Sequence, residues 1–198
     1  MPREKALVES SQLCAKGQCR IKAVRPIDEL PRPPTMSEIT GQQREDTAYH
    51  EAGHAVMGYV LQRFPLLVTI IPDGTGAVGK TEFEKYAPPG GYRYFDDTAE
   101  KKRDIRSRVL IDVAGTIAHD LKFPERDHDE GDKHDDYWAR DLVGGNVSWE
   151  DHEEYLERTR QDGVALLKQN WHLVDKVAAA LLQHGKLMRA DFLAVCGL

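Results

Sequence analysis

Residues 45–64, EDTAYHEAGHAVMGYVLQRF, decide the fold of this 198-residue chain. Apolar residues recur in this stretch at helical spacing: Ala52, Ala55, Val56, Tyr59 and Val60. Pro65 ends the pattern, and Thr47 is the expected N-cap, because its side-chain oxygen can accept a hydrogen bond from a main-chain N–H of the first turn. The pattern therefore predicts an amphipathic helix that buries one face in the core.

The same stretch contains the pentapeptide HEAGH, residues 50–54, with two histidines four positions apart. Residues at this spacing share one face of a helix, so the imidazoles of His50 and His54 can reach one zinc ion. Glu51 then lies where it can act as general base on a water at that ion. Roughly 0.02 such matches are expected by chance in a chain of this composition, which argues against an accidental pairing.

A catalytic zinc usually takes three protein ligands, so a third is expected outside this helix. Met57 and Val60 stand where a metzincin has glycine and histidine. Glu82 and Glu84 fall in a predicted strand, which argues against a glutamate ligand from a following helix. The acidic segment 124–136, expected to be polar and outside the core, holds the open candidates: Asp127, His128, Asp129, Asp132, His134, Asp135 and Asp136.

Elsewhere the patterns predict mostly helices and one small sheet. Strands are expected at residues 66–72 and within 76–84; helices are expected from a cap at 96–98 to about Leu121, from a capping box at Ser148 to about residue 170, over 173–185 and over 189–195. We expect residues 37–198 to form one domain, mainly α within the α+β class, and residues 1–36 to form an extended or loosely docked arm. Trp138 is expected to be a packing anchor and His119 to lie on a helix surface.

Charge and hydropathy exclude several function classes. The chain has 27 basic and 33 acidic side chains, a formal net charge of −6, which argues against nucleic acid and anionic membranes as partners. No run approaches the roughly 20 apolar residues of a membrane-spanning helix, and the first residues lack the apolar core of a secretory signal. We expect a cytoplasmic protein with no membrane and no nucleic-acid partner.

Over most of residues 40–198 the chain resembles the zinc peptidase domain of the FtsH-type membrane AAA proteases. Four segments carry the resemblance: TAYHEAGHAV at 47–56, VTIIPDGTGAVG at 68–79, IDVAGTIAHDL at 111–121 and HDDYWARDL at 134–142. The resemblance implies a zincin-type helical domain with a small sheet beside the metal-binding helix. It also implies one zinc per chain held by His50, His54 and Asp135, with Asp136 as the fallback third ligand.

As a function, the resemblance implies a zinc-dependent endopeptidase that cuts unfolded or flexible polypeptides. An extended peptide would add to an open strand edge near residues 68–71 or 76–83, so four residues are the expected substrate-binding positions: Val68, Ile70, Gly76 and Gly79. The family's AAA ATPase module has no counterpart in residues 1–198, so we expect ATP-independent cleavage by this chain. A separate ATPase or delivery partner, and a homo-oligomer, stay open.

Two alternatives also stay open. The first is a metal-stabilised binding or adaptor module with the peptidase fold, although the intact Glu51 favours activity because a structural metal site has no use for a base. The second is nucleotide binding, since Gly74, Gly79, Lys80 and Thr81 match the phosphate-loop pattern GxxxxGKT. A phosphate loop must open a helix, and only six residues separate Thr81 from Pro88, so nucleotide binding is the less favoured alternative.

Overall fold

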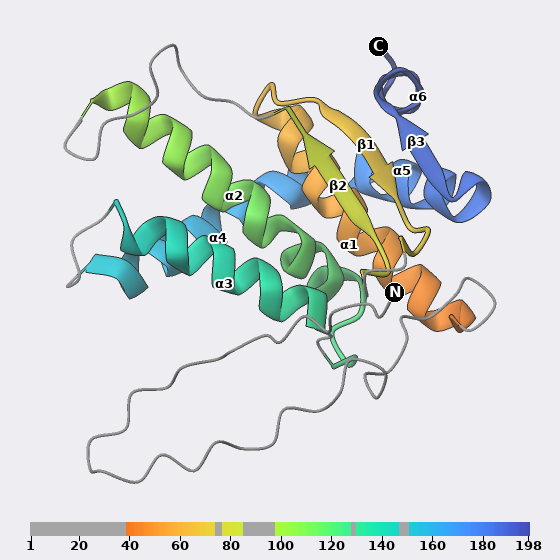
Figure 1. The fold of residues 1–198 in the computed structure, drawn as a ribbon, viewed down its shortest axis with the longest axis horizontal. Helices are drawn as coiled ribbons and strands as arrows, with labels where there is room; N and C mark the ends of the chain where they lie inside the picture. The colour runs from red at the N-terminus through yellow and green to blue at the C-terminus, as the bar shows by residue number, and fades with distance from the viewer. Residues whose placement is uncertain (1–38, 74–76, 85–97, 128–129, 147–150) are drawn as a thin grey trace, which may run out of the picture. The chain divides into compact units, whose positions relative to one another are not determined.

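The computed structural model describes residues 39–73, 77–84, 98–127, 130–146 and 151–198. Their elements, in chain order, are α1 (Gly41–Val60), β1 (Pro65–Thr69), β2 (Lys80–Phe83), α2 (Ala99–Lys122), α3 (Glu130–Gly144), α4 (His152–Gln169), α5 (Trp171–His184), β3 (Lys186–Met188) and α6 (Arg189–Cys196). The predicted mainly helical domain with one small sheet is confirmed (Figure 1). The N-terminal arm lies outside the described residues, so the domain boundary at residue 36 stays a prediction.

The N-cap of helix α1 lies seven residues before the predicted one. Thr40 is the N-cap: its side chain accepts from the Gln43 N–H, and the Gln43 side chain accepts from the Thr40 N–H, which makes a capping box. The expected cap at Thr47 is wrong, because the Thr47 hydroxyl donates to the Gln43 carbonyl inside the helix (2.8 Å). The polar residues from Gly41 to Asp46 carry no apolar period, so the pattern alone placed the start too late.

The sheet has the order β2-β1-β3, and both pairs of strands are antiparallel. The sequence predicted β1 and β2 but not β3, which is only three residues long. Gly185 ends α5 as predicted, with the left-handed φ of 76° that glycine adopts without strain. Its carbonyl accepts from the Ile70 N–H (2.9 Å), which ties the end of α5 to the chain just after β1.

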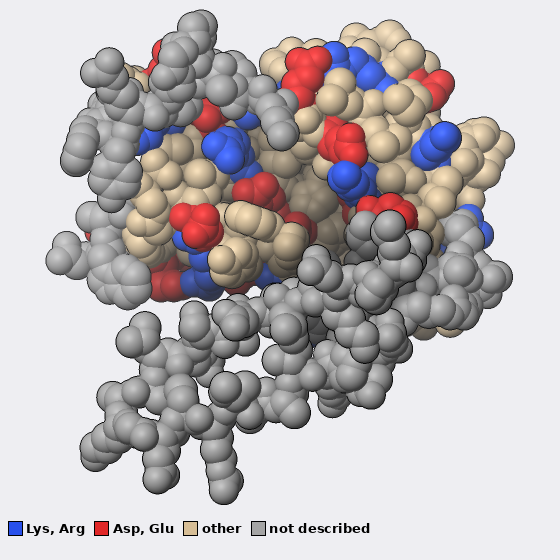
Figure 2. All heavy atoms as spheres, viewed as in Figure 1, with Lys and Arg blue, Asp and Glu red and all other residues tan. Residues whose placement is uncertain are grey.

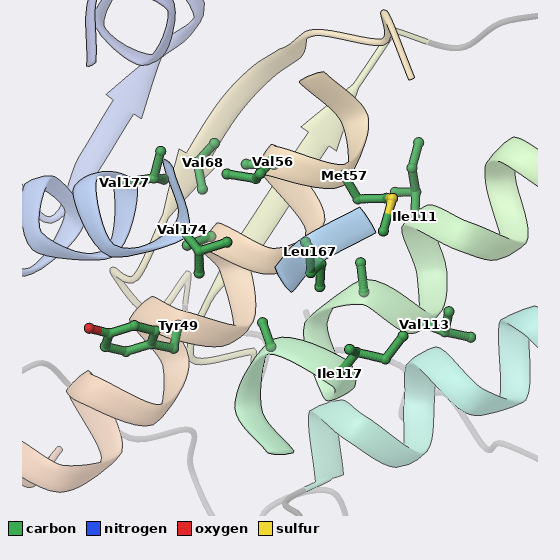
Figure 3. Packing of buried hydrophobic residues seen from close by; sticks show 14 of the residues in the cluster. Tyr49, Val56, Met57, Val68, Ile111, Val113, Ile117, Leu167, Val174 and Val177 are labelled. Carbon is green, nitrogen blue, oxygen red and sulfur yellow. The ribbon is translucent and has the colours of Figure 1, made fainter. Parts of the chain in front are cut away.

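The core lies where α1 packs against α2 and α5 (Figure 3). Val56, Met57 and Val174 are fully buried there. Helices α1 and α2 approach closely at Gly53, because a Cβ at that position would lie 2.4 Å from the Ala114 carbonyl oxygen. This close approach places the HEAGH segment directly against α2.

The acidic segment contains the main correction to the predicted fold. Helix α3 begins at Glu130 and buries Ala139 and Val143, so the segment expected to lie outside the core leads into a packed helix. Trp138 is 49% exposed on α3 and is not a packing anchor, whereas His119 is buried rather than on a surface. The predicted helices α2, α4, α5 and α6 are confirmed, although Ser148 lies outside the described residues.

Candidate metal centre

Three side chains from two helices converge on one point. His50 and His54 lie one turn apart on α1, and Asp135 reaches them from α3. The Nε2 atoms of the two histidines are 3.0 Å apart, and Asp135 Oδ2 lies 2.9 Å from His50 Nε2 and 3.0 Å from His54 Nε2. Among the described residues, this is the one group of three or more potential ligands that gathers within reach of a single ion.

The hydrogen bonding of His54 shows that this group fits a cation. Its Nδ1 lies 2.7 Å from the Ile111 carbonyl oxygen, which can only accept, so the proton of the neutral ring is on Nδ1. The Nε2 lone pair then faces Asp135 Oδ2, and two acceptors at this distance repel unless a cation lies between them. Zinc bonds of about 2.0 to 2.1 Å in tetrahedral geometry place ligand atoms roughly 3.3 Å apart, close to the spacing here.

Electrostatics concentrate negative charge at this group, where it can attract a proton or a metal ion. Burial raises the pKa of Asp135, but the two imidazoles beside it have the larger combined effect and hold that pKa well below its usual range. Burial lowers the pKa of His54, and the Asp135 carboxylate more than reverses this, so the His54 pKa is raised. The aspartate therefore stays charged and attracts positive charge to the two histidines.

Glu51 lies beside this group and is held by β2. Its side chain is buried, and burial raises the pKa of its carboxyl, opposed by His50 and His54. The Thr81 hydroxyl donates to Glu51 Oε2 (2.7 Å), and a Cβ at Gly79 would lie 2.7 Å from Glu51 Oε1. This role of Thr81 was not predicted from the sequence, where the residue falls in the predicted strand within 76–84 and in the phosphate-loop pattern.

Gly115 on α2 makes room for both imidazoles. A Cβ at this position would lie 2.4 Å from His54 Nε2 and 2.6 Å from His50 Nε2. Any larger residue would therefore displace the rings. The need for a small residue here explains why the segment 111–121 carries Ala114 and Gly115 at the centre of its helix.

The structure also separates the other candidate ligands from the group. The fallback ligand Asp136 accepts from Arg140 and Arg160, at 2.8 Å each, and so is engaged away from the imidazoles. His134 Nε2 accepts from the Trp138 indole N–H (2.6 Å), and Asp127 is exposed. His128 and Asp129, like the side chain of Asp132, lie outside the described residues.

The predicted substrate-binding residues divide between the strands. Val68 is buried in β1, opposite Thr81 on one side and Leu187 on the other, so the open edge expected at this strand is wrong. Ile70 follows β1 and is also buried. Gly79 lies against Glu51, whereas Gly76 lies outside the described residues. Among the described residues, β2 has no partner along its outer edge.

The less favoured alternative, nucleotide binding by a phosphate loop, is contradicted at the residues that the structure describes. Lys80 and Thr81 lie in β2, an extended strand, whereas a phosphate loop presents these residues at the N-terminus of a helix. Lys80 pairs with Glu82 (2.5 Å), and Thr81 donates to Glu51. The segment that matched GxxxxGKT is therefore the strand that flanks Glu51.

A mainly helical domain that brings HExxH histidines and an aspartate from a second helix to one point is typical of a metallopeptidase. Residues 37–142 match the model of peptidase family M41, and the chain belongs to that family. The match covers α1, β1, β2 and α2 completely and includes Asp135 on α3.

Curated relatives agree with this assignment. The chain is 36% identical over 88 residues to the mitochondrial inner membrane m-AAA protease component YTA10 of Saccharomyces cerevisiae, covering 43% of this chain and 10% of that protein. It is 34% identical over 112 residues to the ATP-dependent zinc metalloprotease FtsH of Haemophilus influenzae, covering 56% and 16%. For the mitochondrial ATP-dependent zinc metalloprotease FTSH 3 of Oryza sativa, identity is 50% over 192 residues, covering 80% and 23%. The chain thus spans a tenth to a quarter of these relatives.

No helix among the described residues is both long enough and apolar enough to cross a membrane.

Proposed function

We propose that this chain is a zinc-dependent metallopeptidase. The observation that carries the proposal is the convergence of His50, His54 and Asp135 beside the buried carboxylate of Glu51. These three side chains would hold the zinc. When bound, zinc would lower the pKa of a water molecule and polarise the carbonyl of the scissile peptide bond.

Glu51 would carry the proton in this reaction. Its carboxylate accepts a proton from the attacking water and later delivers it to the nitrogen of the leaving amine. Burial, which raises the Glu51 pKa, makes the protonated form accessible at the moment it is needed. Thr81 keeps the carboxylate in place through its hydroxyl, because the 2.7 Å hydrogen bond fixes Oε2.

The substrate we propose is an unfolded or flexible polypeptide in extended form. The outer edge of β2 supports this, because a peptide can add there as a further strand through main-chain hydrogen bonds. Thr81, in the same strand, contacts Glu51, so such a peptide would run beside the proton-carrying group. Recognition through main-chain atoms needs no folded partner surface.

ATP-independent cleavage by residues 1–198 is part of the same proposal. The H. influenzae and O. sativa relatives are named ATP-dependent, and the matched region is a small part of each, so a separate ATPase that delivers substrate stays compatible with it. A homo-oligomer and a cytoplasmic location stay predictions.

The test compares zinc content and hydrolysis of unfolded casein across three proteins. We expect about one zinc per chain and cleavage in wild type, zinc without cleavage in Glu51→Gln, and neither in His54→Ala. Full zinc in His54→Ala would overturn the ligand assignment. Zinc with no cleavage of any unfolded chain by wild type would favour the adaptor module instead.

A matched pair of variants tests the third ligand. Asp135→Ala should lose zinc, whereas Asp136→Ala should keep it, because Asp136 pairs with Arg140 and Arg160. Both variants remove one carboxylate from neighbouring positions of α3, so a general effect on the helix would appear in both. Equal zinc loss would contradict the choice of Asp135.

A further inference from the structure

A pocket of about 480 Å³ opens beside the metal centre, and the zinc chemistry proposed for that centre does not use it. Its apolar surface comes from Phe64, Phe83 and Ile111. Ile111 links it to the metal centre, because its carbonyl oxygen accepts from His54 Nδ1. Figure 2 shows the surface hollowed between α2 and β2, with charged side chains of both signs around the hollow.

Most charges around the pocket are already paired. Arg63 forms an ion pair with the buried Asp104, and Arg189 pairs with Glu84 (2.9 Å). Arg189 also donates to the carbonyls of Phe64 and Pro65. Within each of these two ion pairs, the positive and negative charges compensate each other.

Two charged groups of the lining remain, Arg108 and Asp112, one turn apart on α2. No residue in the described part of the chain forms a hydrogen bond or an ion pair with either. Arg108 is exposed to solvent, whereas Asp112 is partly buried. The charged and titratable groups that act on Asp112 are His54, Asp135 and Arg108.

Of these two groups, the partly buried carboxylate of Asp112 has the larger effect on which ligand charge the pocket binds. Burial raises the pKa of Asp112 to about 6, which reflects poor solvation of its charged form. An ion pair made by the partly buried Asp112 is therefore stronger than one made by the exposed guanidinium of Arg108. An ion pair at an exposed position contributes at most about 1 kcal/mol. A buried carboxylate without a partner destabilises the folded protein. Such a group beside a reactive centre is typical of a residue that binds a ligand.

We propose that this pocket takes a lysine or arginine side chain of the substrate, with Asp112 as the specificity-determining residue. The inference rests on the proposed peptidase function. The hydrocarbon stem of the basic side chain would lie against Phe64, Phe83 and Ile111, and its charged end would reach Asp112.

The position of β2 tells where in the substrate this basic residue lies. Phe83 is the last residue of β2, two positions after Thr81, which contacts Glu51. Two residues of a strand span about 7 Å, so a peptide on the outer edge reaches the pocket within about two or three residues of the bond being cut.

The test uses a series of peptides that differ only in carrying Lys, Leu or Glu at each position from three before to three after the cleaved bond. At one position, we expect the kcat/KM of wild type for Lys to exceed that for Leu or Glu at least about tenfold, as a charge-assisted hydrogen bond provides. Asp112→Asn should lose this preference, and Asp112→Arg should favour Glu. Asp120→Asn is the control, since it makes the same change on the same helix, about 12 Å along its axis.

A binding measurement separates this inference from the proposed function. Fluorescence anisotropy of labelled peptides with Glu51→Gln should show the same preference for Lys, lost in Glu51→Gln/Asp112→Asn. Binding with this pattern but no cleavage by wild type would overturn the function and keep the pocket. Cleavage without a basic preference, or a preference that survives in a folded Asp112→Asn, would overturn the pocket and keep the function.

Discussion

Replacing Gly115 with alanine should weaken zinc binding in an otherwise folded protein. The added Cβ would lie 2.4 Å from His54 Nε2 and 2.6 Å from His50 Nε2, whereas ordinary contacts begin at 3.4 Å. The rings must therefore move by about 1 Å, and zinc sites tolerate deviations of only about 0.2 Å in their bond lengths. Retreat of helix α2 would instead open its close backbone packing against Gly53 of α1, so the side-chain rings are the groups that give way. We expect zinc affinity to fall about 10- to 100-fold.

The assay is competition for zinc with a chromophoric chelator, together with circular dichroism of the metal-free proteins. Gly41→Ala is the matched control, because a Cβ at Gly41 has nothing within 4 Å, and this variant should bind zinc like wild type. A folded Gly115→Ala protein that binds zinc as tightly as wild type would refute the positions assigned to the two imidazoles.

Two other changes test the surroundings of the centre. Thr81→Val keeps the side-chain shape but removes the hydroxyl that donates to Glu51, so we expect kcat to fall about tenfold at similar KM. Because that hydrogen bond lowers the pKa of Glu51, its loss should move the acid limb of the pH–rate profile to higher pH. An unchanged profile would argue against the contact. For Asp112, the pKa is raised from 3.8 to about 6 in the folded state, so folding favours the protonated form and stability falls as pH rises between these values, by at most about 3 kcal/mol. Asp112→Asn removes this loss of stability. Urea unfolding with a chelator present should show that the stability of the variant, relative to wild type, increases from pH 4 to pH 6.5 and then levels off. A pH-independent difference would contradict the raised pKa.

Local spacing was sufficient to predict the metal-binding helix. The period of apolar residues and the four-residue separation of His50 and His54 depend only on the geometry of one helix, so they can be recognised without knowing what packs against it. The same holds for the stop at Gly185, where a left-handed residue ends α5. The start of α1 was misplaced because its first turn is polar and carries no period.

The third ligand depended on packing between segments far apart in the chain. Spacing alone left seven Asp and His candidates between residues 127 and 136. Burial of Ala139 and Val143 sets the rotation of α3, and that rotation turns Asp135 toward the histidines and Asp136 toward Arg140 and Arg160. The resemblance to the FtsH-type proteases indicated Asp135, but no property of the segment by itself distinguishes it from its neighbour.

The amino-acid sequence by itself therefore determined the helical class, the HEAGH helix and the chemistry of its histidines, because these follow from interactions within about four residues. Only the tertiary structure decided that β1 is enclosed, that Thr81 holds Glu51 and that Asp112 lines a pocket with no hydrogen-bond or ion-pair partner among the described residues. Each of these depends on segments about 15 to 120 residues apart, whose pairing is set by burial of the shared core rather than by any local pattern.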